Sequence, residues 1–349
     1  MKKVGILFVS LLCGSLAYAQ DFCIKDYGEV SDTNKVCTEA IQKAVDACHM
    51  NGGGRVVVPA GLYKTGTIVL KDGVELHFSS GANLVSSRNP ADFKVFPPTS
   101  YRSLKDAGGW VSMIYAEGAR NIAITGLGTI DGRGSGYKGT IHGVAGDCNG
   151  RPRNILFISC KNVHVEGITM RNSALWNQHY LNCEDVTVNN IRVWNHCNGN
   201  NDGVDIDGCR RFVLSNSIID SDDDGIVLKS TGMAPCEDVN ITGVPDGYIE
   251  NVTLRHIDIQ TRGGLKKGSY RTPGDDANIR HDTSGNLFAS QYWKSAKQVK
   301  EDVNGYPQPT VWGNLPCYGL FVRHVKNITM QDVHFSSKGT EPRPAIIQE

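Results

Sequence analysis

Short runs of alternating apolar and polar residues recur along much of this chain of 349 residues. The clearest copies start at a cysteine, at intervals of 23, 26 and 27 residues: Cys160, Cys183, Cys209 and Cys236. Weaker copies start at three asparagines: Asn121, Asn251 and Asn327. Alternation with a period of two predicts strands, and short strands that return about every 20 to 30 residues predict a solenoid of stacked coils.

The repeat favours an all-β fold, a single-stranded right-handed parallel β-helix. Leucine-rich repeats share the period, but they need a ladder of leucines that this chain lacks. In a β-helix the repeated cysteines would form an inward-facing column, either as buried thiols or as local disulfides. Near the start of the chain, five residues recur at helical spacing before a run of glycines: Ala40, Ile41, Ala44, Val45 and Cys48. We therefore expect an N-terminal helix that caps the open end of the solenoid.

The first residues have the three parts of a secretory signal peptide. Two lysines precede an apolar run that ends at Leu16, and Ala17-Tyr18-Ala19 offers a small-residue cleavage site. The apolar run is too short to cross a bilayer, so we expect no membrane span. The sequence therefore predicts a signal peptide over 1–19, a single β-helix domain over 20–349, and a protein that is secreted, periplasmic or attached to the cell surface.

Composition narrows the classes of partner. The chain has 36 basic and 36 acidic residues, so its net charge gives no reason to expect nucleic acid or an anionic membrane surface. It has no C-x-x-C pair and no Cys/His cluster with zinc-finger spacing, so we expect no metal site. Residues 261–316 interrupt the strand rhythm, and we interpret this irregular insertion as either a functional flap or a disordered segment.

Acidic residues concentrate in two successive copies of the repeat. Asp202 lies in the run 200–208, and Asp223 and Asp224 lie in the run 220–230. Asp202 and Asp223 are 21 residues apart, slightly less than one coil, so their carboxylates should stand nearly above one another, about 4.8 Å apart. Like charges this close raise each other's pKa and favour a shared proton, which suits the acid and base of glycosidic cleavage. A calcium site and a solvated turn are the alternatives.

These motifs resemble the polygalacturonase-like enzymes of glycoside hydrolase family 28, which degrade pectin and have a pectin-lyase-like β-helix. Asn200-Asn201-Asp202 matches the family motif Asn-x-Asp, and Asp223-Asp224 matches the Asp-Asp motif one coil on. The runs 128–132 and 172–176 support the match. The resemblance implies that Asp223 is the general acid and that Asp202 and Asp224 activate the attacking water. Such a reaction inverts the anomeric carbon and uses no metal or other cofactor.

The resemblance also implies a set of substrate-binding residues that point into one cleft: Asn200, Gln178, His179, Lys229 and Trp176. Lys229 would either neutralise a uronate carboxylate or pair with the aspartates. Trp176 would either stack on a sugar face or lie buried on the repeat. The implied partner is a pectic polysaccharide, polygalacturonan or rhamnogalacturonan, and we expect a monomer.

The sequence departs from the family after Lys229. The Gly-His-Gly and Arg-x-Lys motifs are absent, as if several central coils had been deleted near residue 240. Those coils would form one wall of the cleft and supply the basic pair that grips the galacturonate. We therefore expect an intact acidic triad with weakened or lost activity. Two other functions stay open, a non-catalytic pectin-binding β-helix and a calcium-dependent polysaccharide lyase.

Overall fold

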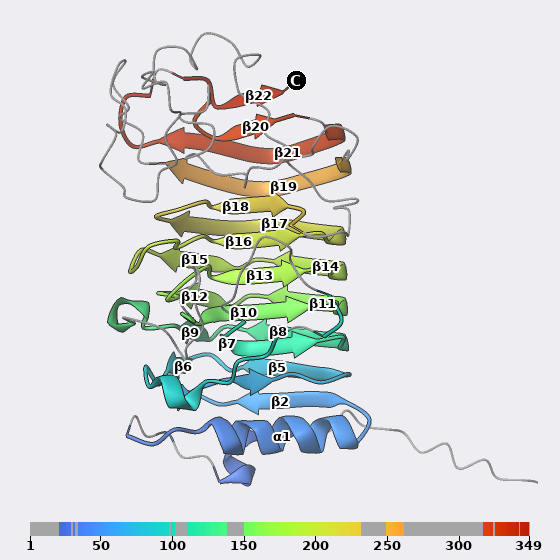
Figure 1. The fold of residues 1–349 in the computed structure, drawn as a ribbon, viewed down its shortest axis with the longest axis vertical. Coiled ribbons are helices and arrows are strands. Elements are labelled where there is room, and N and C mark those ends of the chain that lie inside the picture. The colour runs from blue at the N-terminus through green and yellow to red at the C-terminus, as the bar shows by residue number, and fades with distance from the viewer. Residues whose placement is uncertain are drawn as a thin grey trace, which may run out of the picture.

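The computed structural model describes residues 21–28, 31, 34–97, 99–101, 110–137, 150–231, 249–261, 317–323, 325–341 and 343–348. These residues form the predicted right-handed parallel β-helix, with coils stacked from α1 at one end to β22 at the other (Figure 1). All strand pairs within the described ranges are parallel. The predicted signal peptide and nearly all of the predicted insertion, from residue 262 on, lie outside the described residues.

Most strands belong to one sheet of 14 strands. One ladder of this sheet runs through β1 (Asp21–Cys23), β2 (Gly54–Val58), β5 (Val74–Phe78), β8 (Arg120–Gly126), β11 (Lys161–Glu166), β14 (Glu184–Asn189) and the long β17 (Arg210–Ser221). The ladder continues through β19 (Ile249–Thr261) and β21 (Val325–Ser337). A second ladder, which also ends on β17, runs through β3 (Gly61–Thr65), β6 (Ala82–Ser86), β9 (Thr129–Asp131), β12 (Thr169–Arg171) and β15 (Arg192–Asn195).

A second sheet has six strands and carries the residues of functional interest. Its strands, in spatial order, are β4 (Ile68–Val69), β7 (Ser112–Glu117), β10 (Arg153–Ile158), β13 (Gln178–Leu181), β16 (Val204–Asp207) and β18 (Ile226–Lys229). A third sheet pairs β20 (Leu320–Val322) with β22 (Ile346–Gln348). Each coil therefore passes from the six-stranded sheet into the larger sheet and back.

The expected capping helix is α1 (Thr38–Met50), which covers the first coil (Figure 1). Its buried residues are four of the five that the helical spacing singled out: Ile41, Ala44, Val45 and Cys48. Three short 3-10 helices occur in the described residues: η1 (Ile24–Tyr27), η2 (Pro90–Asp92) and η3 (Gly134–Gly136). None of the helices in the described part of the chain is long and apolar enough to span a bilayer.

Four successive coils enter the larger sheet through a residue in the left-handed conformation. The second residues of β8, β11, β14 and β17 have φ values of 55°, 54°, 56° and 51°: Asn121, Asn162, Asp185 and Arg211. Asparagine and aspartate adopt this conformation more readily than other residues with a Cβ. This geometry explains why Asn or Asp stands two residues after the cysteine in most copies of the repeat.

The repeated cysteines lie inside the solenoid. Cys160, Cys183 and Cys209 are buried free thiols, so the structure decides against local disulfides at these positions. The Cys183 thiol donates to the carbonyl of Phe157 at 3.4 Å. Burial raises the pKa of Cys183 well above its ordinary value, so this thiol stays protonated and unreactive.

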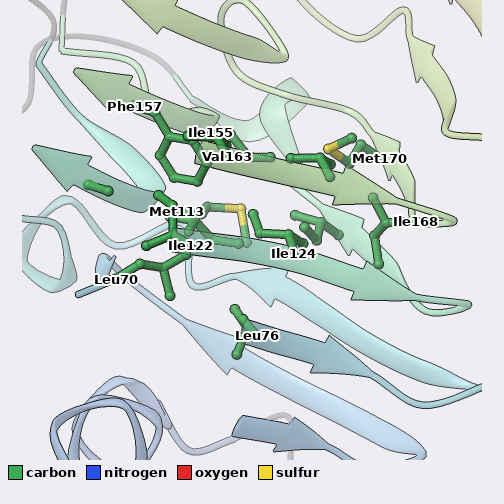
Figure 2. Packing of buried hydrophobic residues seen from close by; sticks show 14 of the residues in the cluster. Leu70, Leu76, Met113, Ile122, Ile124, Ile155, Phe157, Val163, Ile168 and Met170 are labelled. Carbon is green, nitrogen blue, oxygen red and sulfur yellow. The ribbon is translucent and has the colours of Figure 1, made fainter. Parts of the chain in front are cut away.

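Alternate residues of each strand fill the interior with apolar side chains. Ile122 and Ile124 of β8 stand opposite Val163 and Val165 of β11, and all four are buried. Figure 2 shows Ile122, Ile124 and Val163 packed in the interior with Met113 of β7. Each coil thus buries an apolar face that it could not bury alone.

Substitutions at two adjacent residues of β17 test which side chains point into the interior. Leu214 is 3% exposed and Val213 is 41% exposed. Leu214→Ala is expected to lower the free energy of unfolding by about 2–5 kcal/mol, because it removes buried methyl groups and leaves a cavity. Val213→Ala, the matched control, should change it by less than about 1 kcal/mol. Urea unfolding followed by circular dichroism measures both, and equal effects would contradict the assigned strand register.

The outer face of the six-stranded sheet changes character along the stack. On the coils nearer the N-terminus this face carries a cluster of buried apolar side chains: Trp110, Tyr115, Leu156, Ile158 and Leu181. Four partly buried residues pack against the cluster: Val69, Val95, Phe96 and Tyr101. On later coils the positions in register with these residues are polar. His179 and then Asp205 occupy the register position of Leu156. Asp207 and then Lys229 occupy that of Leu181. The polar rows mark the part of the fold where a site can form.

Candidate active site

The two acidic runs lie on neighbouring coils, in register through β16 and β18. Val204 stands opposite Ile226, an offset of 22 residues. Just before these strands, the backbone N–H of Gly203 donates to the carbonyl of Asp224 at 2.8 Å. Asp224 therefore continues the row of Asp202, and Asp223 comes one residue earlier. The two runs lie on neighbouring coils, as expected, but the expected pairing of Asp202 with Asp223 is wrong by one residue: the offset of 22 residues places Asp224 above Asp202.

The two coils approach closely because residue 203 is a glycine. A Cβ atom on Gly203 would lie 2.3 Å from the carbonyl oxygen of Gly225 and 2.4 Å from a methyl carbon of Ile219. The backbones of the acidic runs can therefore hydrogen-bond directly only if this position has no side chain.

This contact predicts the effect of a single methyl group. Gly203→Ala is expected to push the two runs apart, lowering the free energy of unfolding by about 1–3 kcal/mol and any hydrolytic rate by roughly 10-fold or more. Gly199→Ala is the control, because a Cβ there meets no atom within 4 Å. Thermal unfolding and a reducing-sugar assay would measure both variants, and a fully active Gly203→Ala protein would refute the close contact.

Amide side chains hold the loop that carries Asp202. Asn201 accepts hydrogen bonds from the backbone N–H of Cys197 at 2.8 Å and of Asn198, and its amide donates to the carbonyl of Ser173 at 2.8 Å. Asn195 donates to the backbone carbonyl of Asp202 at 2.9 Å. Both side chains are fully buried, so the loop is fixed on two sides before any substrate binds.

Asn200 lies on the exposed side of the same loop. Its backbone is left-handed, with φ of 54°, and its side-chain oxygen accepts a hydrogen bond from Nη2 of Arg151 at 2.7 Å. Arg151 also donates to the carbonyl of Ala174 at 2.9 Å. The sequence did not single out Arg151, Asn195 or Asn201, and the repeated asparagines of the run 195–201 were the signal that could have found the last two.

Burial and mutual repulsion raise the pKa values of Asp202 and Asp224 in the acidic cluster. Asp202 is 5% exposed, and burial together with Asp205, Asp224 and Asp223 raises its pKa well above the ordinary value. Burial, Asp223 and Asp205 raise the pKa of Asp224 to about 7, although Lys229 opposes the shift. Asp223 itself is exposed. Asp202 and Asp224 therefore form a stacked pair of buried carboxyl groups beside the accessible side chain of Asp223.

Trp176 contacts both Lys229 and His179 beside this cluster. The Lys229 ammonium lies 3.5 Å from the centre of the Trp176 ring and 2.8 Å from Oδ1 of Asp205. The His179 ring packs edge-on against Trp176 at 5.1 Å between centroids. Lys229 thus pairs with an aspartate, and all three side chains are buried, at 1%, 6% and 0% exposure.

A further aspartate and the remaining predicted binding residue lie deeper. His179 faces Asp207 at 3.4 Å, and Asp207 accepts a hydrogen bond from the backbone of Thr231 at 2.8 Å. Gln178 is fully buried and accepts a hydrogen bond from the Tyr180 hydroxyl at 2.9 Å. Of the five predicted binding residues, the structure brings together Trp176, His179 and Lys229, and it places Asn200 at the surface and Gln178 in the interior.

The arrangement suits acid–base chemistry. Three neighbouring carboxyl groups, two of them with raised pKa values, can hold and exchange protons near neutral pH, which general acid–base catalysis requires. Among the described residues, no group of three or more His, Cys, Asp or Glu side chains is arranged to hold a metal ion.

Comparison with known families defines the class of protein. Residues 48–264 match the sequence profile of glycosyl hydrolases family 28. The chain therefore belongs to this family, and both acidic runs fall within the matched segment.

Individual relatives have related names. The chain is 29% identical over 220 residues to a probable polygalacturonase of Vitis vinifera, covering 61% of this chain and 45% of that protein. It is 28% identical over 247 residues to an exo-poly-alpha-D-galacturonosidase of Dickeya chrysanthemi, covering 58% of this chain and 41% of that protein. The chain thus spans less than half the length of these two relatives.

A solved structure shares the fold. The exopolygalacturonase of Thermotoga maritima aligns with a TM-score of 0.57 and 24% identity, over 69% of this chain and 66% of that one. This likeness supports the right-handed β-helix.

Proposed function

We propose that this protein is a glycoside hydrolase that cleaves galacturonate-containing pectic polysaccharide by an inverting, metal-independent mechanism. The observation that carries the proposal is the stacking of Asp202 on Asp224 with Asp223 beside them. The names of the relatives supply the substrate class, polygalacturonate. The predicted signal peptide would take the protein out of the cytoplasm, and such a polymer is found outside it.

The positions of the three aspartates support a division of roles. Asp223 is exposed, so the glycosidic oxygen of a polymer can reach it, and we assign it as the general acid. Asp202 and Asp224 are more buried and have raised pKa values, and we assign them to the activation of water. A general base works best when its pKa lies near the working pH, which the value of about 7 for Asp224 satisfies near neutrality.

The test is the release of reducing ends from polygalacturonate and from rhamnogalacturonan. Asp223→Asn is expected to lower kcat by about 10²- to 10⁴-fold, which is the usual contribution of a general acid. Asp258→Asn is the control, because Asp258 is exposed on β19. Equal rates for the wild type and Asp223→Asn would remove Asp223 as the acid. An unsaturated product that absorbs ultraviolet light would indicate a lyase instead.

One observation favours a second candidate, a pectin-binding β-helix without turnover. Trp176, His179 and Lys229 are buried, and the Gly-His-Gly and Arg-x-Lys motifs are absent from the sequence. Retention of the protein on immobilised polygalacturonate, with no reducing ends released between pH 4 and pH 9, would establish this alternative and overturn the proposed hydrolysis.

A further inference from the structure

His196 makes two ion-pair contacts beside the acidic cluster. It follows β15 directly, and its Nε2 atom lies 2.8 Å from Oδ1 of Asp220. Its Nδ1 atom lies 2.8 Å from Oδ1 of Asp222. The imidazole thus bridges two carboxylates that flank Ser221, one at the end of β17 and one in the acidic run. The proposed catalytic roles give no part to any of these three residues.

The two contacts hold the imidazole ring between two acidic side chains. A carboxylate can only accept hydrogen bonds, so Nε2 of His196 donates to Asp220. A hydrogen bond to an ionised acceptor is stronger than one between neutral groups. The Trp194 ring lies against the imidazole, with centroids 4.5 Å apart and the planes tilted by 51°. The contact is therefore a clamp between two aspartates, with an aromatic ring packed against it.

The clamp joins the two loops that carry the proposed catalytic groups. Asp222 directly precedes Asp223 and Asp224, whereas His196 belongs to the segment that leads to Asp202. The backbone N–H of Asp222 also donates to the carbonyl of Asn195 at 3.0 Å. Side-chain and main-chain contacts therefore hold the two loops together at adjacent points.

We propose that His196 is a positioning residue, which holds the loop of Asp223 and Asp224 at the correct distance from Asp202 through Asp220 and Asp222. This inference rests on the proposed hydrolysis for its kinetic consequence, but the clamp itself can be measured without activity. His196 touches no proposed reacting group, so it acts through its partners.

The kinetic experiment compares His196→Gln with the same substitution at a second histidine, His164. His196→Gln is expected to lower kcat by about 10- to 100-fold, because small displacements of catalytic groups have effects of that size, and to leave KM within about 3-fold. His164→Gln is the control, because His164 contacts the single carboxylate of Glu166 at 2.8 Å on β11. An unchanged kcat for His196→Gln, or an effect mainly on KM, would overturn the positioning role.

A double-mutant cycle tests whether His196 affects kcat through its contact with Asp222. Asp222→Asn should lower kcat by a similar factor, and the combined variant His196→Gln/Asp222→Asn should be little worse than either single variant. Multiplicative losses would show that His196 and Asp222 act independently and would contradict the clamp. Asp222 is partly exposed, so Asp222→Asn keeps the test available if His196→Gln does not fold.

Amide hydrogen exchange gives a readout that does not depend on turnover. In His196→Gln the amides of residues 222–225 should exchange at least about 10-fold faster than in the wild type, since the loop loses a charged contact. Unchanged exchange would overturn the clamp. If the wild type hydrolyses neither polymer, the proposed function fails, and the exchange result still decides whether His196 holds the loop.

Discussion

Replacing Asp224 with asparagine is expected to abolish most hydrolysis and to stabilise the protein above neutral pH. The loss of kcat should reach about 10²- to 10⁴-fold, because the variant removes a group that activates water. Polygalacturonate hydrolysis, measured by reducing ends, gives this value, and Asp258→Asn serves again as the control.

The gain in stability follows from the pKa of Asp224, which burial and the neighbouring aspartates raise to about 7. An unfolded aspartate has a pKa of about 3.9. Between these values the folded state binds a proton that the unfolded state has released, so this carboxyl reduces stability progressively as the pH rises from about 4 to 7. Asn avoids that penalty and should add about 1–3 kcal/mol at pH 8, after allowance for partial exposure.

The pH dependence separates this explanation from a general effect of the substitution. The difference in unfolding free energy between Asp224→Asn and the wild type should be largest at pH 8 and should shrink towards pH 4. A difference that is constant with pH would contradict the raised pKa. A fully active Asp224→Asn protein would contradict its role with water.

Replacing Lys229 with methionine is expected to give the largest loss of stability among the charged positions considered. Lys229 is 1% exposed and pairs with the fully buried Asp205 at 2.8 Å. Removal of one partner from a buried pair leaves an uncompensated charge and costs about 3–5 kcal/mol. Lys229 also lowers the pKa values of Asp202, Asp207 and Asp224, so its loss should raise all three and move the activity profile to higher pH.

Two further variants show whether the effect comes from the buried pair. Lys71→Met removes an exposed partner that lies 2.7 Å from Asp46, and exposed pairs contribute only about 0–1 kcal/mol. The double variant Lys229→Met/Asp205→Leu should recover part of the loss, because it leaves no unpaired charge. If urea unfolding gave the same small loss for Lys229→Met and Lys71→Met, the buried pair would have no special role.

The predicted and observed folds agree where the pattern is local and repeated. Alternation of apolar and polar residues predicted the coils, and the spacing of Ile41, Ala44 and Cys48 predicted the helix at their end. The left-handed turns at Asn121, Asn162 and Asp185 explain why the repeat is visible in the sequence at all, since each turn needs a residue type that tolerates this conformation.

The sequence predicted which acidic residues lie close together in the site, but it did not predict which of them pair with one another. The spacing in the sequence predicted that Asp202 and the Asp223-Asp224 pair lie on neighbouring coils, because the length of a coil fixes the spacing of stacked residues to within a residue or two. Which aspartate stands on Asp202 depends on the register of β16 and β18, and one residue of slip reverses the direction of every side chain. The pairing of Lys229 with Asp205, which the sequence left open against binding of a uronate, depends on the same register.

The sequence by itself determined the repeating strands, the capping helix and the concentration of carboxyl groups on two coils, because residue type and spacing along the chain are sufficient for each. Only the tertiary structure decided that Asn195 and Asn201 hold the loop of Asp202, that Lys229 is buried against Asp205, and that His196 bridges Asp220 and Asp222. The contacts of Asn195 depend on the turn geometry of one loop, whereas those of Lys229 and His196 join residues from different coils and depend on strand register. No local sequence pattern records either the turn geometry or the register.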